Sequence, residues 1–171
     1  MYWAECPPDP TKDPWKVRRF GHFDDGGWGG MAKLAIADID RDGQQDIIAS
    51  EAEIPEAKLG IFSRDRAQPE GLWKYREIDA GLYCPHSLVL ADLDNNGRID
   101  IITGEMTAGG WSFPLHPRPR IIAYLGQADG TFPRQELAAG LGVHAGQGAI
   151  GSLNLVLDGR QQHSPPNFGL D

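Results

Sequence analysis

The amino-acid sequence predicts an all-β chain made of β-propeller blades, each with four antiparallel strands. An acidic loop occurs twice in the same apolar frame, starting at Asp38 and again 54 residues later at Asp92. Each copy is followed by two further short apolar runs, so one repeat holds four strands within roughly 50 to 60 residues, which is typical of a propeller blade. Glycine (22 residues) and proline (13 residues) are abundant, as expected where short strands are joined by turns.

The two acidic loops have the composition of a metal site. They span 38–46 and 92–100, with oxygen-bearing side chains at loop positions 1, 3, 5 and 9 and a glycine at position 6. A hard cation such as Ca²⁺ requires several oxygen ligands from a tightly curled loop, and the glycine permits the sharp turn. We therefore predict two Ca²⁺ sites, whose ligating side chains are Asp38, Asp40, Asp42 and Asp46 in the first loop and Asp92, Asp94, Asn96 and Asp100 in the second.

Two other structures share part of this loop pattern. An EF-hand has the same first three positions and the same glycine, but it also needs a bidentate glutamate at position 12 and flanking helices. Position 12 is Ala49 or Thr103 here, and the flanking runs are short and apolar. The other alternative is a plain solvated turn rich in Asp and Gly. Two copies in matched frames favour metal binding, with the ion in a structural role.

The strands follow from apolar runs on either side of each loop. Two short runs around a tight loop predict a hairpin, and two later runs complete a blade. The expected strands are 34–37, 46–49, 59–62 and 73–78 in the first blade and 88–91, 100–103, 121–125 and 132–137 in the second.

The two complete blades are flanked by shorter matches to the repeat. Ranges 1–5 and 15–20 are similar to a third and a fourth strand, and 144–158 stands where a new blade would begin but carries no acidic loop. We therefore expect partial blades at both ends. Residues 1–158 are expected to form the propeller segment, and 159–171 a loop or a disordered tail.

Composition excludes several classes of protein. The chain has 24 acidic against 16 basic residues, a net charge of -8, whereas a nucleic-acid-binding protein needs a basic face. The sequence contains no run of 18 apolar residues, so it predicts no membrane-spanning helix. No signal peptide is visible in the first residues. The sequence leaves open whether its two cysteines, Cys6 and Cys84, form a disulfide.

At its acidic loops the chain resembles the FG-GAP/VCBS repeat family, which includes the calcium-bearing propeller blades of integrin α-subunits and of many bacterial secreted proteins. The family motif D-x-D-x-D-G-x-x-D, followed by a hydrophobic strand, is matched in full by 38–48, and 92–102 matches it with Asn96 in place of the third aspartate. The resemblance covers roughly residues 30 to 145. It implies a propeller blade with Ca²⁺ between its first and second strands, and it adds the backbone carbonyls of Gln44 and Arg98 to the two ligand sets.

Two further groups of residues are candidate sites. Two histidines stand at the start of equivalent strands, and two glutamates stand at the end of equivalent strands. These four side chains could meet at a propeller channel, as a second metal site or as acid–base groups. The alternative is that the histidines are ordinary turn residues. This candidate channel site consists of His86, His144, Glu51 and Glu105. Trp28 and Trp111 stand in glycine-rich loops and are candidate contacts for a sugar or a peptide.

These observations favour a calcium-binding propeller module that binds or scaffolds carbohydrate or protein without catalysis. By analogy with the family, we expect it outside the cytoplasm, in an extracellular or periplasmic location. The first alternative is part of a propeller enzyme acting on sugars, of the polysaccharide lyase or sugar dehydratase type. The second is a truncated gene fragment without a function of its own. Because two complete and two partial blades cannot close a ring, we also expect a homodimer that completes a propeller of about six blades.

Overall fold

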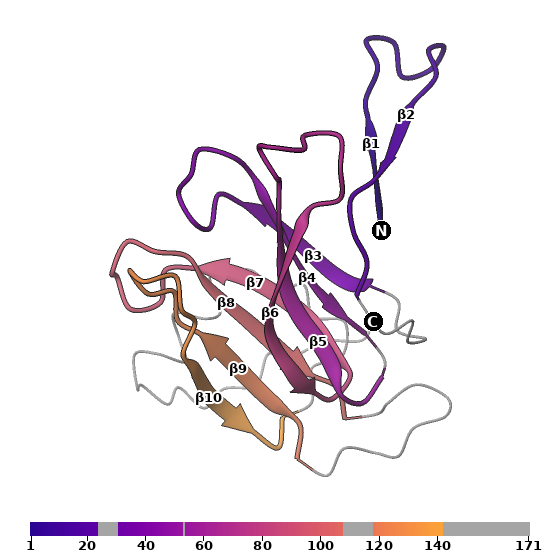
Figure 1. The fold of residues 1–171 in the computed structure, drawn as a ribbon. Coiled ribbons are helices and arrows are strands. Elements are labelled where there is room, and N and C mark those ends of the chain that lie inside the picture. The colour runs from indigo at the N-terminus through magenta and orange to yellow at the C-terminus, as the bar shows by residue number, and fades with distance from the viewer. Residues whose placement is uncertain (24–30, 53, 108–117, 142–171) are drawn as a thin grey trace, which may run out of the picture.

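The computed structural model describes residues 1–23, 31–52, 54–107 and 118–141. Within these ranges the chain forms ten β-strands and no helix, arranged in three antiparallel sheets (Figure 1). The predicted all-β class is therefore confirmed. None of the three sheets closes on itself, so the propeller arrangement stays a prediction. The expected partial blade at 144–158 and the tail at 159–171 lie outside the described residues.

Two of the sheets are four-stranded meanders in which each strand pairs with the next one along the chain. The first sheet contains β3 (Met31–Ala37), β4 (Asp46–Glu51), β5 (Ala57–Ser63) and β6 (Lys74–Leu82). The second contains β7 (Pro85–Ala91), β8 (Asp100–Glu105), β9 (Arg120–Tyr124) and β10 (Arg134–Ala139). All eight strands overlap the ranges expected from the sequence.

Several strands extend beyond the apolar runs that predicted them. β6, for example, continues to Leu82 rather than ending at residue 78. The pairing of β3 with β4, of β5 with β6 and of β7 with β8 contains register shifts near the strand ends. Backbone pairing continues past such bulges whatever the side chains are, which is why hydrophobic pattern alone gave strands that were too short.

The repeat extends to the register of the sheets. Ala37 faces Asp46 where the first acidic loop begins and ends, and Ala91 faces Asp100 in the second copy. Strands β4 and β8 are buried at every position, because each lies between two other strands and has both faces covered. Each acidic loop therefore joins an edge strand to a second strand that is buried along its whole length.

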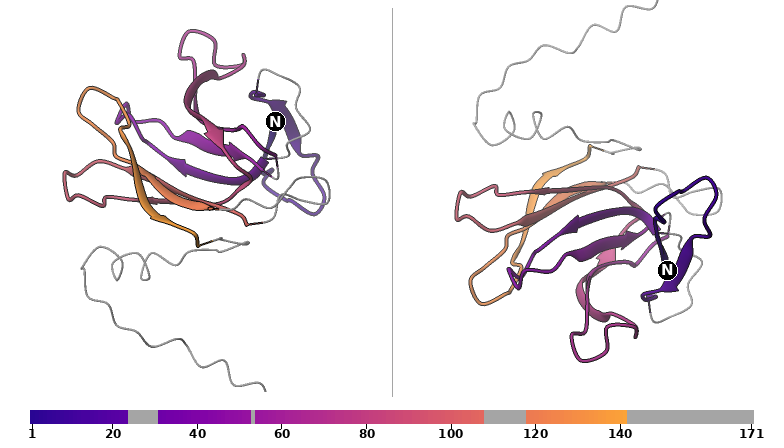
Figure 2. Two further views of the ribbon diagram at one scale, coloured as in Figure 1. Left: turned by 90° about the horizontal axis from the view of Figure 1, so that it is seen from below. Right: turned by 90° about the horizontal axis from the view of Figure 1, so that it is seen from above.

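The two four-stranded sheets pack against each other across an apolar core. Ile48, Leu59 and Ile61 of the first sheet belong to one buried cluster with Ile122 and Tyr124 of the second. β3 lies alongside β7, and Figure 2 shows the two sheets stacked when the molecule is seen from below and from above. This packing brings equivalent ends of the two sheets together.

A short hairpin, β1 (Tyr2–Glu5) and β2 (Lys16–Arg19), forms the third sheet and packs beside the first. The buried Phe20 ring lies 5.7 Å from that of Phe62 and 5.5 Å from that of Trp73, between ring centroids. The Trp73 backbone N–H also donates to the Phe20 carbonyl at 2.7 Å. The sequence ranges 1–5 and 15–20 are thus confirmed as paired strands, held to the first sheet by aromatic packing.

The structure answers the open question about the cysteines. Cys6 is exposed, Cys84 is buried, and both are free thiols. Within the described residues, no helix is long and apolar enough to span a membrane.

Candidate metal centre

Both acidic loops adopt the same curled backbone. In the loop between β3 and β4, Arg41 and Gly43 have positive φ angles of 63° and 86°, and the equivalent Asn95 and Gly97 between β7 and β8 have 57° and 79°. Glycine adopts this left-handed conformation without steric cost, and asparagine tolerates it better than most residues. The backbone of the two loops therefore turns at the same two positions and points the intervening side chains inward.

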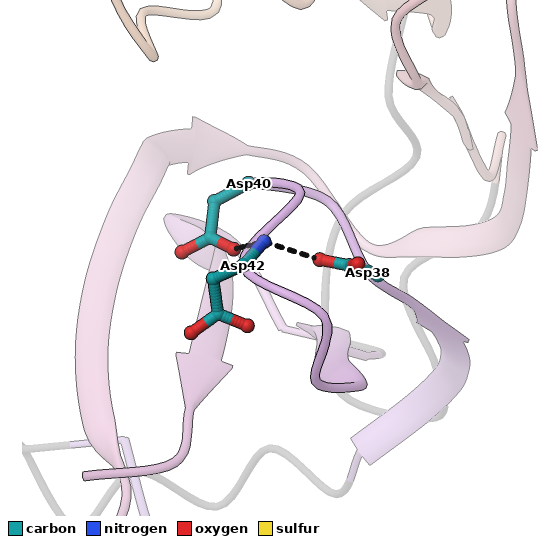
Figure 3. A group of neighbouring side chains, drawn as sticks. All are labelled: Asp38, Asp40 and Asp42. Atoms are coloured by element: carbon teal, nitrogen blue, oxygen red, sulfur yellow. Dashed lines mark hydrogen bonds between the residues drawn. The ribbon is translucent and has the colours of Figure 1, made fainter. Parts of the chain in front are cut away.

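Three carboxylates converge in the first loop. One oxygen from each of Asp38, Asp40 and Asp42 lies within 4.8 Å of the other two, and Figure 3 shows these side chains gathered in the curl of the loop. Ca²⁺ holds oxygen ligands at about 2.3–2.6 Å, so two ligands of one ion lie at most about 5 Å apart. The spacing of these carboxylates fits a single Ca²⁺, and their chemistry fits a hard cation.

Backbone N–H groups hold the carboxylates of the first loop in place. The Asp42 N–H donates to Asp38 Oδ1 at 2.9 Å and to Asp40 Oδ1 at 3.0 Å (Figure 3). The Gly43 N–H donates to Asp38 Oδ2 at 2.9 Å, and the Gln44 N–H donates to Asp42 Oδ1 at 2.8 Å. Each carboxylate is therefore oriented before any ion binds, which lowers the entropic cost of assembling the site.

The second loop repeats the backbone hydrogen bonds of the first, but a different set of three carboxylates converges in it. One oxygen from each of Asp92, Asp94 and Asp100 lies within 4.8 Å of the other two. The Asn96 N–H donates to Asp92 Oδ1 at 3.0 Å and to Asp94 Oδ1 at 3.1 Å, and the Gly97 N–H donates to Asp92 Oδ2 at 2.8 Å. Asn96 keeps an oxygen at position 5 but carries no charge, and Asp100 at position 9 supplies the third carboxylate of this group.

The aspartates at loop position 9 are both buried, but only Asp100 belongs to one of the two converging groups. Asp46, a predicted ligand of the first loop, is not part of the group formed by Asp38, Asp40 and Asp42. Asp46 and Asp100 expose only 2% and 0% of their surface. Asp46 accepts the Ile39 N–H at 3.1 Å, and Asp100 accepts the N–H groups of Leu93 at 2.6 Å and Gly126 at 2.7 Å. Burial raises the pKa of both carboxyl groups, and the neighbouring loop carboxylates raise it further. A bound cation would offset both effects.

The two loops lie next to each other at the same end of the paired sheets (Figure 1). Arg41 of the first loop extends toward the second, with its Nη2 atom 3.5 Å from the position that a Gly97 side chain would occupy. Ile39 and Asp40 of the first loop line a cavity of about 80 Å³ together with Arg98 of the second. The candidate metal centre is therefore a pair of adjacent loops.

The glutamates of the candidate channel site end β4 and β8, and both are buried. Glu51 accepts the backbone N–H of Lys58 at 2.9 Å, and Glu105 accepts that of Arg120 at 2.9 Å. Each glutamate thus bonds the next strand of its own sheet. Of the histidines, His86 lies in β7 and His144 lies outside the described residues, so the meeting of all four side chains stays a prediction.

Glu105 makes further contacts with Tyr83 and Arg120. It accepts the Tyr83 N–H at 2.9 Å and Arg120 Nε at 2.8 Å, and it forms an ion pair with Arg120 Nη2. Burial alone would raise the pKa of Glu105, but the hydrogen bonds and charge of Arg120, with the bond from Tyr83, outweigh it and lower the pKa below its ordinary value.

Two contacts of the loops were not expected from the sequence. Arg66, in the β5–β6 connection, forms an ion pair with Asp42 at 3.1 Å. Gly126, which follows β9, bonds Asp100 and accepts the Asn96 amide N–H at 3.1 Å. Both partners come from other parts of the sheet, and no spacing in the sequence indicates them.

Some predicted site residues are not placed by the structure. Trp28 and Trp111 lie outside the described residues, and metal coordination by the carbonyls of Gln44 and Arg98 stays a prediction. Comparisons of the chain with protein-family models, with curated proteins and with solved structures found no match. The geometry of the two acidic loops is accordingly the basis for a functional assignment.

Proposed function

We propose that this chain is a calcium-binding β-propeller module that binds carbohydrate or protein ligands, without catalysis, in an extracellular or periplasmic location. The observation that carries the proposal is the convergence of three carboxylates within 4.8 Å in each of two equivalent loops. Clustered carboxylates repel one another unless a cation lies among them. Two loops with the same backbone curl and hydrogen bonds fit two copies of one kind of site.

Ca²⁺ fits these loops better than Mg²⁺. Mg²⁺ demands near-ideal octahedral geometry at about 2.0–2.1 Å and keeps several of its waters, whereas Ca²⁺ accepts six to eight oxygens in flexible geometry. Carboxylates, an amide oxygen and loop carbonyls offer the larger and more irregular ligand set. The bound ion would rigidify the β3–β4 and β7–β8 connections and thereby the end of the molecule on which they lie.

The alternative of a sugar-acting enzyme has less support from the described residues. Glu105 is fully buried and accepts hydrogen bonds from four donors on Tyr83 and Arg120. A carboxylate held in this way stabilises the sheet and has little freedom to exchange a proton with a substrate. A non-catalytic binding role therefore accounts better for the observed contacts.

Isothermal titration calorimetry with Ca²⁺ tests the metal assignment directly. We expect two sites per chain, and we expect Asp40→Ala and Asp94→Ala each to remove one of them, because each substitution deletes a charged ligand from one cluster. Asp129→Ala is a matched control, since Asp129 is an exposed aspartate that belongs to neither cluster. Absence of Ca²⁺ binding by the unsubstituted protein, or two sites remaining in both ligand variants, would contradict the proposal.

We propose a second copy of the chain as a partner, on the outer face of β3. Leu34 is 49% exposed, whereas its repeat equivalent Leu88 on β7 packs against the core that the first sheet covers. The same position is thus covered in one repeat and uncovered in the other. Because a sheet of this chain already covers the equivalent face, a sheet from a second copy has a suitable shape and apolar surface.

Analytical ultracentrifugation tests this association. We expect a concentration-dependent dimer, and we expect Leu34→Lys to shift the protein to monomer without lowering its melting temperature, because the side chain is half exposed in the single chain. Leu72→Lys, at a 50% exposed position in the β5–β6 connection, should leave the mass unchanged. A monomeric unsubstituted protein, or a dimer that survives Leu34→Lys, would refute association through this face.

A further inference from the structure

A cavity of about 370 Å³ lies between the N-terminal hairpin and the first sheet. Its volume is within the range of about 300–1,000 Å³ seen for small-molecule sites. Trp3 and Trp73 contribute indole rings to its lining, and Ile36 and Ile47 contribute aliphatic surface. The polar lining residues are Gln44, Gln45 and Arg64. This combination of mostly apolar lining with a few polar groups is typical of a ligand site.

The Arg64 guanidinium lies over both indole rings. Its Cζ atom lies 5.4 Å from the centroid of the Trp3 ring and 5.0 Å from that of the Trp73 ring. Cation–π attraction at these distances holds the guanidinium in the lining of the cavity. Trp73 is itself fixed by the Phe20 ring and by the backbone bond to the Phe20 carbonyl. The aromatic and cationic groups are therefore held in position before a ligand arrives.

Arg64 differs from the cations around it in having no acidic partner among the residues that the structure describes. Arg18 forms an ion pair with Glu70, Arg66 with Asp42, and Lys74 with Asp65. No described carboxylate pairs with Arg64, although the chain has an excess of acidic residues. An arginine fork presents parallel N–H donors that match a carboxylate in a bidentate contact. The cavity therefore has a preformed position for a ligand carboxylate.

The two glutamines supply the remaining polar groups. An amide side chain both donates and accepts hydrogen bonds, as the hydroxyl groups of a sugar require. Gln44 belongs to the first acidic loop, and its Nε2 donates to Asp42 Oδ2 of the same loop at 3.3 Å. One wall of the cavity thus depends on the conformation of that loop.

We infer that this cavity binds an acidic saccharide, with the apolar face of a pyranose ring on an indole and the uronate carboxylate on the Arg64 guanidinium. The hydroxyl groups of the sugar would bond to the amides of Gln44 and Gln45. A single uronate residue offers an apolar ring face, several hydroxyl groups and one carboxylate. These groups correspond to the indole, amide and guanidinium groups that line the cavity. The inference rests on the proposed carbohydrate-binding function and names the ligand class and the place where it binds.

Calorimetric titration with trigalacturonate, and with neutral galactotriose as the comparison, tests this site. We expect trigalacturonate to bind at least about tenfold more tightly, because a hydrogen bond to a charged group contributes about 1.5–3 kcal/mol. Arg64→Gln should remove this preference, and Trp73→Phe should weaken the binding of both sugars. Arg19→Gln and Trp15→Phe are matched controls, since neither Arg19 nor Trp15 lines the cavity, and both should bind as the unsubstituted protein does.

The titration is run both with Ca²⁺ and with EDTA, because trigalacturonate itself binds Ca²⁺. No binding by the unsubstituted protein, equal affinity for the two sugars, or full affinity in Arg64→Gln would overturn the inference. If trigalacturonate binds but calorimetry detects no Ca²⁺ site, the metal assignment fails and the cavity assignment stands. If Ca²⁺ binds at two sites and neither sugar binds, the metal assignment stands and the cavity assignment fails.

Discussion

Chelation with EDTA is expected to lower the melting temperature of this protein, and added Ca²⁺ should restore it more fully than Mg²⁺. A ligand that binds only the folded chain stabilises it by about 2.7 kcal/mol per site at a free concentration of 100 Kd. For a chain of this length about 1 kcal/mol corresponds to roughly 2–4 °C, so each site should contribute roughly 5–11 °C. Differential scanning calorimetry in EDTA, Ca²⁺ and Mg²⁺ measures the effect. An unchanged melting curve under chelation would exclude structural metal sites.

This stabilisation by Ca²⁺ should depend on pH. The pKa values of Asp46 and Asp100 are raised in the folded chain. Without metal, the folded state retains protons that the unfolded chain has already released, so stability falls as the pH rises from the ordinary aspartate value through the raised values. Ca²⁺ binds the ionised carboxylates and offsets this loss. The rise in melting temperature caused by Ca²⁺ should be small near pH 4 and full at neutral pH, and equal rises at both would contradict this mechanism.

Glu105→Ala is expected to destabilise the fold by about 3–5 kcal/mol, the cost of removing one partner from a buried ion pair. The substitution leaves Arg120 and the Tyr83 N–H without the carboxylate that accepts their hydrogen bonds. Urea unfolding at neutral pH measures the loss. Glu77→Ala is the matched control at an exposed position on β6, and it should change the free energy of unfolding by no more than about 0.5 kcal/mol. Similar losses in both variants would refute the role given to Glu105.

The Glu105 contribution should also vanish in acid. Its pKa is lowered in the folded chain, so the ion pair contributes stability above the ordinary glutamate pKa and loses it as the pH falls through the folded value. The difference between Glu105→Ala and the unsubstituted protein should therefore shrink as the pH is lowered below about 4. Glu105→Gln keeps a hydrogen-bond acceptor but loses the charge. At neutral pH its free energy of unfolding should therefore lie between those of Glu105→Ala and the unsubstituted protein.

The amino-acid sequence by itself determined the repeat, the strands around each loop and the clustering of the aspartates. These features are local. Asp38, Asp40 and Asp42 converge because the backbone N–H groups that orient them lie within the same nine residues, and Gly43 allows the curl. The β4 and β8 strands were predictable because each apolar run is short, contains two β-branched Ile residues and follows a glycine-containing turn, which together favour a strand over a buried helix.

Tertiary structure decided everything that joins residues distant in sequence. Packing of the two sheets sets the two loops side by side, and pairing of β9 with β8 within the second sheet brings Gly126 to Asp100 and Arg120 to Glu105. Docking of the N-terminal hairpin on the first sheet brings Trp3 to Arg64 and Trp73, and so creates the cavity. The spacing of residues within a loop determines which hydrogen bonds the loop makes with itself. Which sheet faces and strand edges contact each other depends instead on how apolar surfaces from the whole chain are buried together.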